Sequence, residues 1–332
     1  MQVAVYTRYG PPDVVQITDV EKPIPEDNEV LIKVRAASVN PYDWHFMRGM
    51  PYLLRLRAGL RKPKDKRLGV DVAGQVETVG RNVTQFKPGD EVFGVSRGAF
   101  AEYACPSESK LARKPENVTF GQAASVPIAG LTALQGLRDK GQIQPGQRVL
   151  INGAAGGVGT FAVQIAKSFG ADVTGVCSTR NLDMLRSIGA DRVIDYTQED
   201  FTKREQRYDV ILDCVANHSL SAFRQILNPK GHYIMVGAAD GGGRWMIGLL
   251  ARLIKALVLS CFVSQKLVMV GAKANKEDLT ILHDLMQAGK VTPVIDRRYS
   301  LREVPEAIRY LEQGHTRGKV LITLGHKHNN KT

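Results

Sequence analysis

The sequence predicts an α/β protein that combines a β-rich, barrel-like domain with a doubly wound parallel sheet. Residues 1–120 contain many short strand-like runs separated by Pro and Gly turns, a spacing typical of small barrels. After about residue 121, strands alternate with helices, as they do in βαβ units. The chain of 332 residues is longer than one ordinary core requires, so we expect two domains.

The first part of the chain contains short runs rich in β-branched residues and bounded by turn residues. They predict strands at residues 3–6, 29–34, 74–79 and 91–94. Residues 319–323, close to the end of the chain, have the same character. Their pattern is compatible with a return of the chain to the first domain.

The second part alternates regularly between apolar strands and amphipathic helices. Helical periodicity covers residues 159–169 and 181–188. Apolar runs predict strands at residues 148–151, 172–176, 192–194, 208–212 and 232–236. This order predicts a parallel sheet with helices on its faces.

The chain is basic, with 45 Lys and Arg against 33 Asp and Glu and a net charge of +12. The densest basic run, RLRAGLRKPKDKR at residues 55–67, has seven Lys or Arg and one Asp. We interpret it as a solvated loop; an acidic partner such as nucleic acid or an anionic membrane surface is the alternative. Neither a zinc finger nor an RNP-type aromatic motif accompanies it, so we predict no nucleic-acid function.

The cellular setting is predicted from the cysteines and from apolar runs. Cys105, Cys177, Cys214 and Cys261 are scattered and form no CxxC pair, which fits isolated thiols in a reducing cytoplasm. The N-terminal residues lack the pattern of a secretory signal. No run of about 18 uncharged apolar residues predicts a transmembrane helix.

The stretch INGAAGGVG, residues 151–159, lies between a predicted strand and a predicted helix. Its Ala154-x-Gly156-x-x-Gly159 spacing matches the dinucleotide fingerprint with Ala at the first glycine. Gly156 allows the backbone to approach a pyrophosphate, Gly159 allows close helix–strand packing, and the helix N-terminus favours an anion. We therefore predict a dinucleotide on Gly156, Gly157, Val158 and Gly159; a tight turn alone is the alternative.

The end of the second strand of this unit indicates which dinucleotide binds. An NAD enzyme usually has Asp or Glu there, whereas this chain has Ser178 and Arg180. A hydroxyl and a guanidinium suit a 2′-phosphate, so we predict NADP(H). In the alternative interpretation, Ser178 caps a helix and Arg180 is solvated.

Several segments together resemble the medium-chain dehydrogenase/reductases, and the resemblance covers essentially the whole chain. Residues 69–94, GVDVAGQVETVGRNVTQFKPGDEVFG, are similar to the quinone oxidoreductase signature, and residues 98–134 and 314–322 match as well. The resemblance implies a GroES-like catalytic domain, built from residues 1–122 and 272–332. It also implies a Rossmann NADP-binding domain at residues 123–271, and usually a homodimer.

The same family includes zinc alcohol dehydrogenases, so the ligand positions decide whether a metal is expected. Where those enzymes carry Cys-x-x-Asp, this chain has Asn40-Pro41-Tyr42-Asp43, and where they carry Gly-His-Glu it has Gly69-Val70-Asp71. The four-cysteine lobe is also missing from residues 80–115. Because zinc requires Cys, His or carboxylate ligands in definite number, we predict no metal.

Without a Lewis acid, hydride addition to a conjugated system is easier than oxidation of a simple alcohol. The resemblance points the same way, so we predict an NADPH-dependent reductase of a lipophilic quinone or an α,β-unsaturated carbonyl such as an enone or alkenal. Two alternatives remain. One is a metal-free NADP-dependent alcohol or aldehyde dehydrogenase, and the other is a membrane-associated NADPH-binding regulator with low activity.

The resemblance also implies roles for single residues. Asn40 is expected to orient the substrate carbonyl, or else to be a turn residue before Pro41. Tyr52 is a candidate proton donor, although its register differs by one from related reductases, and a packing aromatic at the pocket rim is the alternative. Asp43 is expected to make a structural hydrogen bond. On the cofactor side we expect Thr132 near the nicotinamide, Tyr196 beside the adenosine, Val215 and Gly237 at later strand ends, and Lys319 near the phosphates.

Residues 244–270 form a long apolar stretch interrupted by a few basic residues. We interpret it as core, lid or subunit interface, with its last strand pairing across a homodimer. An amphipathic helix in weak peripheral contact with a membrane is the alternative.

Overall fold

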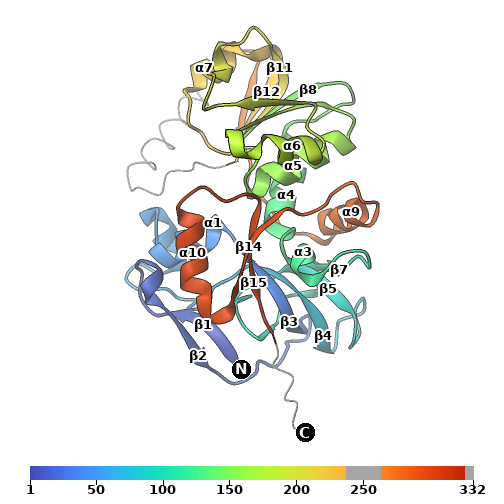
Figure 1. Ribbon diagram of the computed structural model, residues 1–332. Helices are drawn as coiled ribbons and strands as arrows, with labels where there is room; N and C mark the ends of the chain where they lie inside the picture. Colours follow the sequence, from blue (N-terminus) through green and yellow to red (C-terminus); the bar gives the residue numbers. More distant parts are fainter. Residues whose placement is uncertain (237–262, 326–332) are drawn as a thin grey trace.

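The computed structural model describes residues 1–236 and 263–325, and its two large sheets lie in opposite halves of the molecule (Figure 1). Counted over these residues, one sheet has seven strands and the other has six, and a small β1–β2 hairpin, Gln2–Tyr6 with Val15–Asp19, borders the first. The predicted α/β class, with a β-rich part and a doubly wound part, is therefore confirmed.

The seven-stranded sheet takes strands from both ends of the chain. Its order is β14 (Ile295–Ser300), β15 (Lys319–Thr323), β3 (Val30–Val39), β4 (Asp71–Val79), β5 (Glu91–Val95) and β7 (Leu111–Arg113), with β6 (Tyr103–Ala104) on β3. β15 runs antiparallel to β3, with Val320 opposite Val39. The expected return of residues 319–323 to the first domain is thus confirmed.

The six-stranded sheet is parallel throughout. Its order is β10 (Arg192–Asp195), β9 (Asp172–Cys177), β8 (Arg148–Asn152), β11 (Tyr208–Asp213), β12 (Leu227–Met235) and β13 (Lys266–Met269). Among the described residues, the α-helices between its strands are α5 (Gly157–Ser168), α6 (Leu182–Ser187) and α7 (Leu220–Gln225). Every strand predicted between residues 148 and 236 is present in this sheet.

Two strands of the first domain are longer than their sequence patterns indicate. β3 continues to Val39 and β4 begins at Asp71. Small residues in both strands allow the pairing to extend as far as Ser38 and Asp71, whose side chains are buried. α1 (Pro41–Arg48) begins directly after β3, with Asn40 as its N-cap. The extension of β3 places Asn40 at the end of a central strand, facing the second domain.

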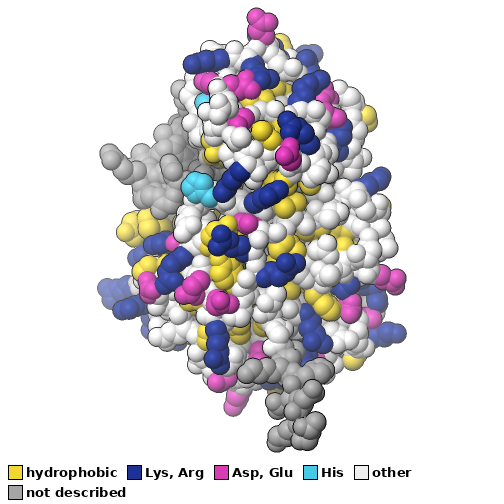
Figure 2. Space-filling model, in the orientation of Figure 1, with side chains coloured by type: hydrophobic (Ala, Val, Ile, Leu, Met, Phe, Trp, Pro, Cys, Tyr) yellow, Lys and Arg dark blue, Asp and Glu magenta, His cyan; other side chains and the backbone are white. Residues whose placement is uncertain are grey.

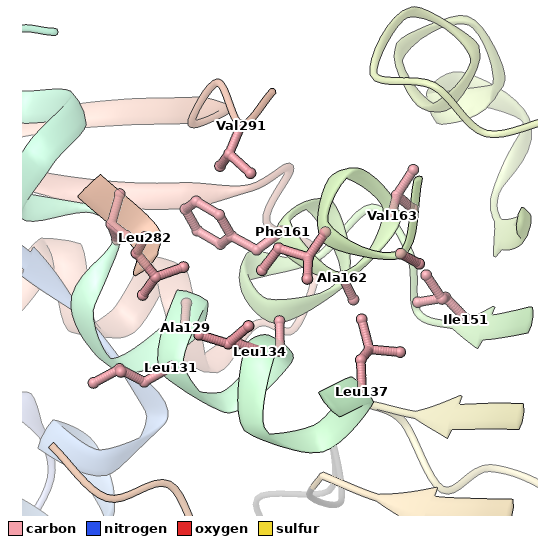
Figure 3. Packing of buried hydrophobic residues seen from close by; sticks show 14 of the residues in the cluster. Ala129, Leu131, Leu134, Leu137, Ile151, Phe161, Ala162, Val163, Leu282 and Val291 are labelled. Atoms are coloured by element: carbon pink, nitrogen blue, oxygen red, sulfur yellow. The ribbon is translucent and has the colours of Figure 1, made fainter. Parts of the chain in front are cut away.

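Helices join the two halves. α4 (Pro127–Gln135) packs on α5 and on α9 (Lys276–Gln287), and Figure 3 shows Leu134, Phe161 and Leu282 in this shared core. The other α-helices in the described part of the chain are α2 (Arg55–Ala58), α3 (Phe120–Ala124) and α10 (Val304–Glu312). The expected domain limits at residues 122 and 271 fall between the strands of the two sheets and stay predictions.

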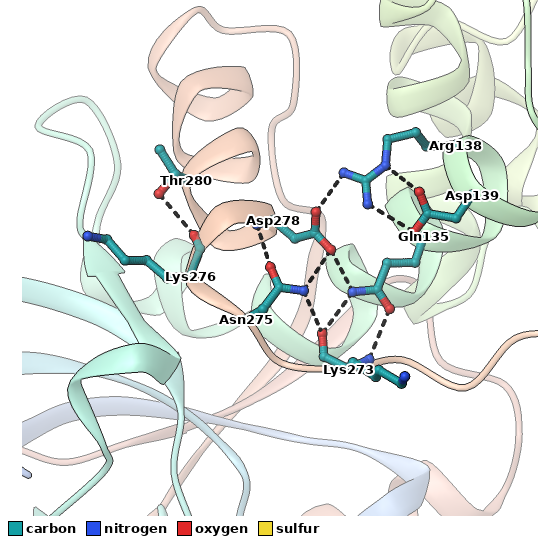
Figure 4. Close-up of polar contacts among 8 residues, drawn as sticks. All are labelled: Gln135, Arg138, Asp139, Lys273, Asn275, Lys276, Asp278 and Thr280. Atoms are coloured by element: carbon teal, nitrogen blue, oxygen red, sulfur yellow. Dashed lines mark hydrogen bonds and ion pairs between the residues drawn. The ribbon is translucent and has the colours of Figure 1, made fainter. Parts of the chain in front are cut away.

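A polar network fixes α9 against α4 (Figure 4). Gln135 Nε2 donates to Asp278 Oδ2 at 2.7 Å, and Arg138 Nη1 donates to Asp278 Oδ1 at 2.6 Å. Burial alone would raise the pKa of Asp278, but hydrogen bonds from Arg138, Asn275 and Gln135 outweigh it and lower that pKa. The junction between the halves is therefore held by paired charge as well as by apolar packing.

The apolar stretch 244–270 is described only at its end. Residues 266–269 form β13, which pairs in parallel with β12 inside the same chain. The interpretation of residues 244–262 as core, lid or membrane-surface helix concerns residues outside the described part of the chain. Pairing of β13 across a dimer stays a prediction.

Candidate active site

A cavity of about 1280 Å³ lies between the two domains. Its walls come from the end of β3 and from α1 on one side, and from the loop after β8 and the ends of β9 and β11 on the other. The carboxyl ends of parallel strands are where open α/β sheets bind ligands. We therefore take this cavity as the candidate active site.

The loop between β8 and α5 forms one side of the cavity. Gly156 is the N-cap of α5, and a Cβ built on it would meet only the Gly153 carbonyl oxygen, at 3.4 Å. A Cβ on Gly159 would lie 2.2 Å from that same oxygen, so the helix rests directly on the strand end. The first amides of a helix lack acceptors within it and attract anions. This open glycine cradle fits a pyrophosphate.

The end of β9 lines the cavity with polar groups that suit a phosphorylated ribose. Ser178 Oγ accepts a hydrogen bond from Asn181 Nδ2 at 3.2 Å. Arg180 Nη2 donates to the His315 carbonyl oxygen at 2.5 Å, so the guanidinium reaches from the Rossmann sheet to the loop before β15. Tyr196, half exposed, lines the same end.

A buried polar cluster borders the cavity where β3, β4 and β15 meet, and its Asn40 and Lys319 belong to the cavity lining. Asn40 Nδ2 donates to Asp71 Oδ2 at 2.8 Å and to the Ser38 carbonyl oxygen at 3.2 Å. Lys319 Nζ donates to Asn40 Oδ1 at 2.6 Å and lies 3.4 Å from Asp71 Oδ2. We call Ser38, Asn40, Asp71 and Lys319 the Asn–Asp–Lys cluster.

The cluster satisfies its carboxylate and fixes its amide. Asp71 also accepts hydrogen bonds from Ser38 Oγ at 2.8 Å and from the Ile128 amide at 3.0 Å. A buried charge that is paired and hydrogen-bonded in this way is tolerated, whereas an unpaired one is strongly destabilising. Both amide hydrogens of Asn40 and its amide oxygen have partners inside the protein.

Lys319 is the only ammonium of the cluster, and it is 3% exposed. Burial lowers the pKa of Lys319, although the carboxylate of Asp71 works in the opposite direction. Its stem lies beside the phosphate loop, because a Cβ on Gly157 would meet Lys319 Cδ at 3.3 Å. Lys319 thus connects the catalytic domain to the glycine cradle.

Asp43 makes the structural hydrogen bond expected of it. Its Oδ2 accepts from the Asn40 amide at 2.8 Å and completes a capping box at the start of α1. Burial raises the pKa of Asp43 to about 7, against hydrogen bonds from the Asn40 and Gly69 amides, which lower it. The side chain therefore holds Asn40 at the end of β3.

Most of the residues expected at the site line the cavity, and their roles stay predictions. Two of them, Thr132 and Tyr52, are not lining residues. Thr132 is buried and donates to the Ile128 carbonyl oxygen at 2.7 Å, and Tyr52 is exposed beside Arg55. Gly237 lies outside the described residues. The expected residues that line the cavity are Asn40, Gly156, Gly157, Val158, Gly159, Ser178, Arg180, Tyr196, Val215 and Lys319.

Part of the wall does not follow from the sequence patterns. No motif points to Trp44, His45 and Arg48 of α1, although all three line the cavity. Asp71, which is buried behind the lining residue Asn40, stands out in the sequence only as a position matching a zinc-ligand segment. The sequence feature that could have revealed the three α1 residues is Pro41, which favours the start of a helix directly after a strand. Successive turns of such a helix place residues 44, 45 and 48 on one face.

Within residues 1–236 and 263–325, no group of three or more His, Cys, Asp or Glu side chains is placed to hold a metal ion. Among the same residues, none of the helices has the length and apolar character required to cross a membrane.

Comparison with known proteins identifies the family. Residues 26–116 match the alcohol dehydrogenase GroES-like domain, and residues 188–322 match the zinc-binding dehydrogenase model. A 2-methylene-furan-3-one reductase of Solanum lycopersicum is 35% identical, over 97% of this chain and 79% of that protein. An NADPH-dependent alkenal/one oxidoreductase of Arabidopsis thaliana is 33% identical over the same shares of the two chains.

A solved structure agrees with these relatives. The quinone oxidoreductase of Coxiella burnetii is 31% identical and superposes with a TM-score of 0.82, over 98% of this chain and 99% of that one. The phosphate loop, the two-domain cavity and the shared strands at both chain ends all fit this likeness. The chain belongs to the medium-chain dehydrogenase/reductases, in their quinone-oxidoreductase-like branch.

Proposed function

We propose that this protein is an NADPH-dependent, zinc-free reductase that transfers hydride to a quinone or an α,β-unsaturated carbonyl. One observation carries the proposal: Asn40 and Lys319 of the Asn–Asp–Lys cluster line the cavity beside the glycine cradle. Asn40 and Asp71 belong to the two segments, residues 40–43 and 69–71, that resemble the zinc-ligand segments of metal-containing relatives. An ammonium in this lining can stabilise an anionic product without a Lewis acid. The tomato and Arabidopsis relatives, named as reductases of such conjugated carbonyls, support the same chemistry.

The glycine cradle and the end of β9 would hold the cofactor. Gly156 and Gly157 would receive the pyrophosphate, and Ser178 and Arg180 the 2′-phosphate. When bound, NADPH supplies the hydride. The protein supplies the orientation of the substrate and the environment of the charge that develops on its oxygen.

Lys319 is suited to meet that charge. Its ammonium has three hydrogens, and two acceptors, Asn40 Oδ1 and Asp71 Oδ2, lie within 3.4 Å. The third hydrogen is left for an oxygen in the cavity that Lys319 lines. A lowered pKa also makes the ammonium a better acid, so it can protonate an enolate or a hydroquinone anion.

The hydrogen bonds of Asn40 favour a different role from the one that the resemblance implies. Because both of its amide hydrogens are donated to Ser38 and Asp71, none is available for a substrate carbonyl. Its oxygen instead accepts from Lys319 and fixes the ammonium at the wall. We therefore propose Asn40 as a positioning residue and Lys319 as the donor to substrate.

We also propose a cytoplasmic homodimer. The scattered cysteines fit a reducing compartment. In the part of the chain that the structure describes, β13 is an edge strand of the six-stranded sheet, and edge strands are usually covered. Light scattering coupled to size exclusion tests the dimer, and a monomeric mass would contradict it.

Steady-state oxidation of NADPH with a quinone, an alkenal and a saturated aldehyde tests the reaction. We expect turnover with the first two substrates, unchanged after treatment with a metal chelator and with no stoichiometric zinc by elemental analysis. Turnover with the aldehyde alone, or activity that requires added zinc, would overturn the proposal.

A further inference from the structure

Residues 52–67, which we call the basic-apolar segment, begin shortly after the end of α1 and contain exposed leucines among cations. Leu53, Leu56 and Leu60 are 61%, 65% and 68% exposed, and Tyr52 is 67% exposed. Across the turns of residues 52–58, Leu56 lies four residues after Tyr52 and three after Leu53, a spacing that places Leu56 near both of them on one side. Exposed apolar side chains that gather in this way mark an interaction site more often than chance exposure does.

The backbone of this segment is held in place, so its leucines are not exposed merely because the loop is loose. Tyr9 Oη donates to the Gly59 carbonyl oxygen at 2.6 Å, and Arg55 Nε donates to the Gly49 carbonyl oxygen at 2.9 Å. The Lys64 amide donates to the Ala58 carbonyl oxygen at 2.7 Å, and the Tyr6 amide to that of Lys66 at 2.8 Å. The anchoring groups face the protein, while the leucines face away from it.

The charge of the segment is not compensated locally. Its single acidic residue, Asp65, pairs with Arg67. Among the described residues, no carboxylate forms an ion pair with any of the five other exposed cations: Arg57, Arg61, Lys62, Lys64 and Lys66. Elsewhere, Figure 2 shows basic and acidic side chains interspersed over much of the face that it presents.

We propose that the basic-apolar segment docks on an anionic lipid surface. In this arrangement Leu53, Leu56 and Leu60 enter the headgroup region, and the flanking cations contact lipid phosphates. An amphipathic turn with a cationic rim is the form that such interfacial contacts take. The proposal concerns binding only and is independent of which substrate the cavity reduces.

Lipid fits this surface better than two other occupants. A second copy meeting it through a two-fold axis would bring the same cations face to face. Nucleic acid would neutralise the cations but would leave three leucines against phosphates and water, with no gain from burying them. Only a surface that is both anionic and apolar accounts for the two kinds of side chain.

Vesicle flotation tests the proposal with the full chain. The probes are extruded vesicles of phosphatidylcholine alone and of phosphatidylcholine mixed with phosphatidylglycerol. We expect binding to the mixed vesicles only, weakened by salt. Absence of binding to the mixed vesicles, or equal binding to both kinds, would overturn the proposal.

Two triple variants separate the apolar and ionic contributions. Leu53→Ser/Leu56→Ser/Leu60→Ser removes the apolar contact and should lower the vesicle partition coefficient on the order of tenfold or more. Arg61→Glu/Lys62→Glu/Lys64→Glu should lower it on the order of a hundredfold. The matched control, Lys87→Glu/Lys110→Glu/Lys290→Glu, has the same change in net charge at other exposed positions and should retain most of the binding.

Turnover of a water-soluble quinone reports whether each variant is folded, and we expect it to be unchanged in all three. If the control loses as much binding as the segment variants, attraction follows net charge alone and the docking surface is wrong. If the wild type bound an oligonucleotide but not the mixed vesicles, and both segment variants lost the oligonucleotide binding, the surface would be assigned to nucleic acid instead. If the wild type did not bind vesicles and the leucine variant had a smaller oligomeric mass than the wild type, the surface would be assigned to contact with a second copy of the chain.

Discussion

Lys319 Nζ lies 2.6 Å from Asn40 Oδ1, a hydrogen bond that joins the first residue of β15 to the residue that follows β3. These two residues are separated by most of the chain, and antiparallel pairing of Val320 with Val39 brings them together. The bond turns the Asn40 amide so that its nitrogen faces Asp71. It also holds a buried cation in the cavity lining, beside the glycine cradle.

Replacing Lys319 by Met should remove most of the catalytic rate. Loss of one donor to a developing oxyanion typically costs about 10²- to 10³-fold in kcat. The change also leaves Asp71 without its ammonium, which should destabilise the fold by about 3–5 kcal/mol. Asp71→Asn/Lys319→Met removes both charges and should recover part of the lost melting temperature, but none of the activity. Recovery of turnover in the double variant would show that Lys319 acts only through stability.

The pH–rate profile should report the same ammonium. Lys319 donates only when it is charged, so activity should be constant at low pH and fall as the pH rises through its pKa. Because burial lowers the pKa of Lys319, the fall should begin below the range of an ordinary lysine. Stopped-flow measurement of hydride transfer across pH checks this. If the pH–rate profile of Lys319→Met showed the same fall at alkaline pH, that fall would belong to another titrating group.

Asp43 should make the stability of the protein depend on pH. Its carboxyl has a pKa of about 7 in the folded state, against 3.8 as the ordinary value. Between these two values the folded state binds the extra proton, so stability should fall as the pH rises from about 4 to 7 and then stay level. The fall attributable to this group is at most about 4 kcal/mol.

Thermal unfolding of the wild type and of Asp43→Asn over that pH window checks this prediction. The side-chain amide oxygen that this substitution introduces can still accept from the Asn40 backbone amide, while the titration is lost. The difference in stability between the two proteins should therefore change with pH between about 4 and 7. A constant difference would show that Asp43 does not titrate there.

The sequence predicted the two sheets and the cradle better than it predicted the catalytic wall. Apolar strands and a glycine spacing are local signals, so β8, α5 and β9 followed from neighbouring residues. The Asn–Asp–Lys cluster depends on strand pairing between residues 38–40, 71 and 319, which no local pattern contains. Lys319 was expected near the phosphates because its neighbours resemble a family motif, and only the fold shows that its charge is held by Asn40 and Asp71.

The choice between NADPH and NADH should depend on Arg180. Arg180→Ala should weaken NADPH binding by roughly 10- to 100-fold, the value of one or two charge-assisted hydrogen bonds, and leave NADH binding nearly unchanged. Fluorescence titration with both cofactors measures this. The control, Arg186→Ala, removes an exposed arginine that pairs with Asp183 outside the cavity. Equal weakening for both cofactors would contradict a 2′-phosphate contact.

The two glycines of the cradle should fail in different ways when each is replaced by Ala. At Gly156 the new methyl would meet only the Gly153 oxygen at an ordinary 3.4 Å, so the protein should keep its melting temperature. The methyl would nevertheless fill space that we assign to the pyrophosphate, so NADPH binding should weaken by tenfold or more, on the order of 1–2 kcal/mol.

At Gly159 the methyl would lie 2.2 Å from the Gly153 oxygen and 2.7 Å from Ala154, which are backbone atoms that cannot move aside. The helix would have to lift from the strand, so Gly159→Ala should lower the melting temperature by several degrees or prevent folding. Calorimetry and NADPH titration on the same two variants separate the effects. A Gly156→Ala variant that lost stability but still bound NADPH normally would contradict the placement of the pyrophosphate at Gly156. That result would show that this glycine is needed for the turn and that the phosphate binds elsewhere.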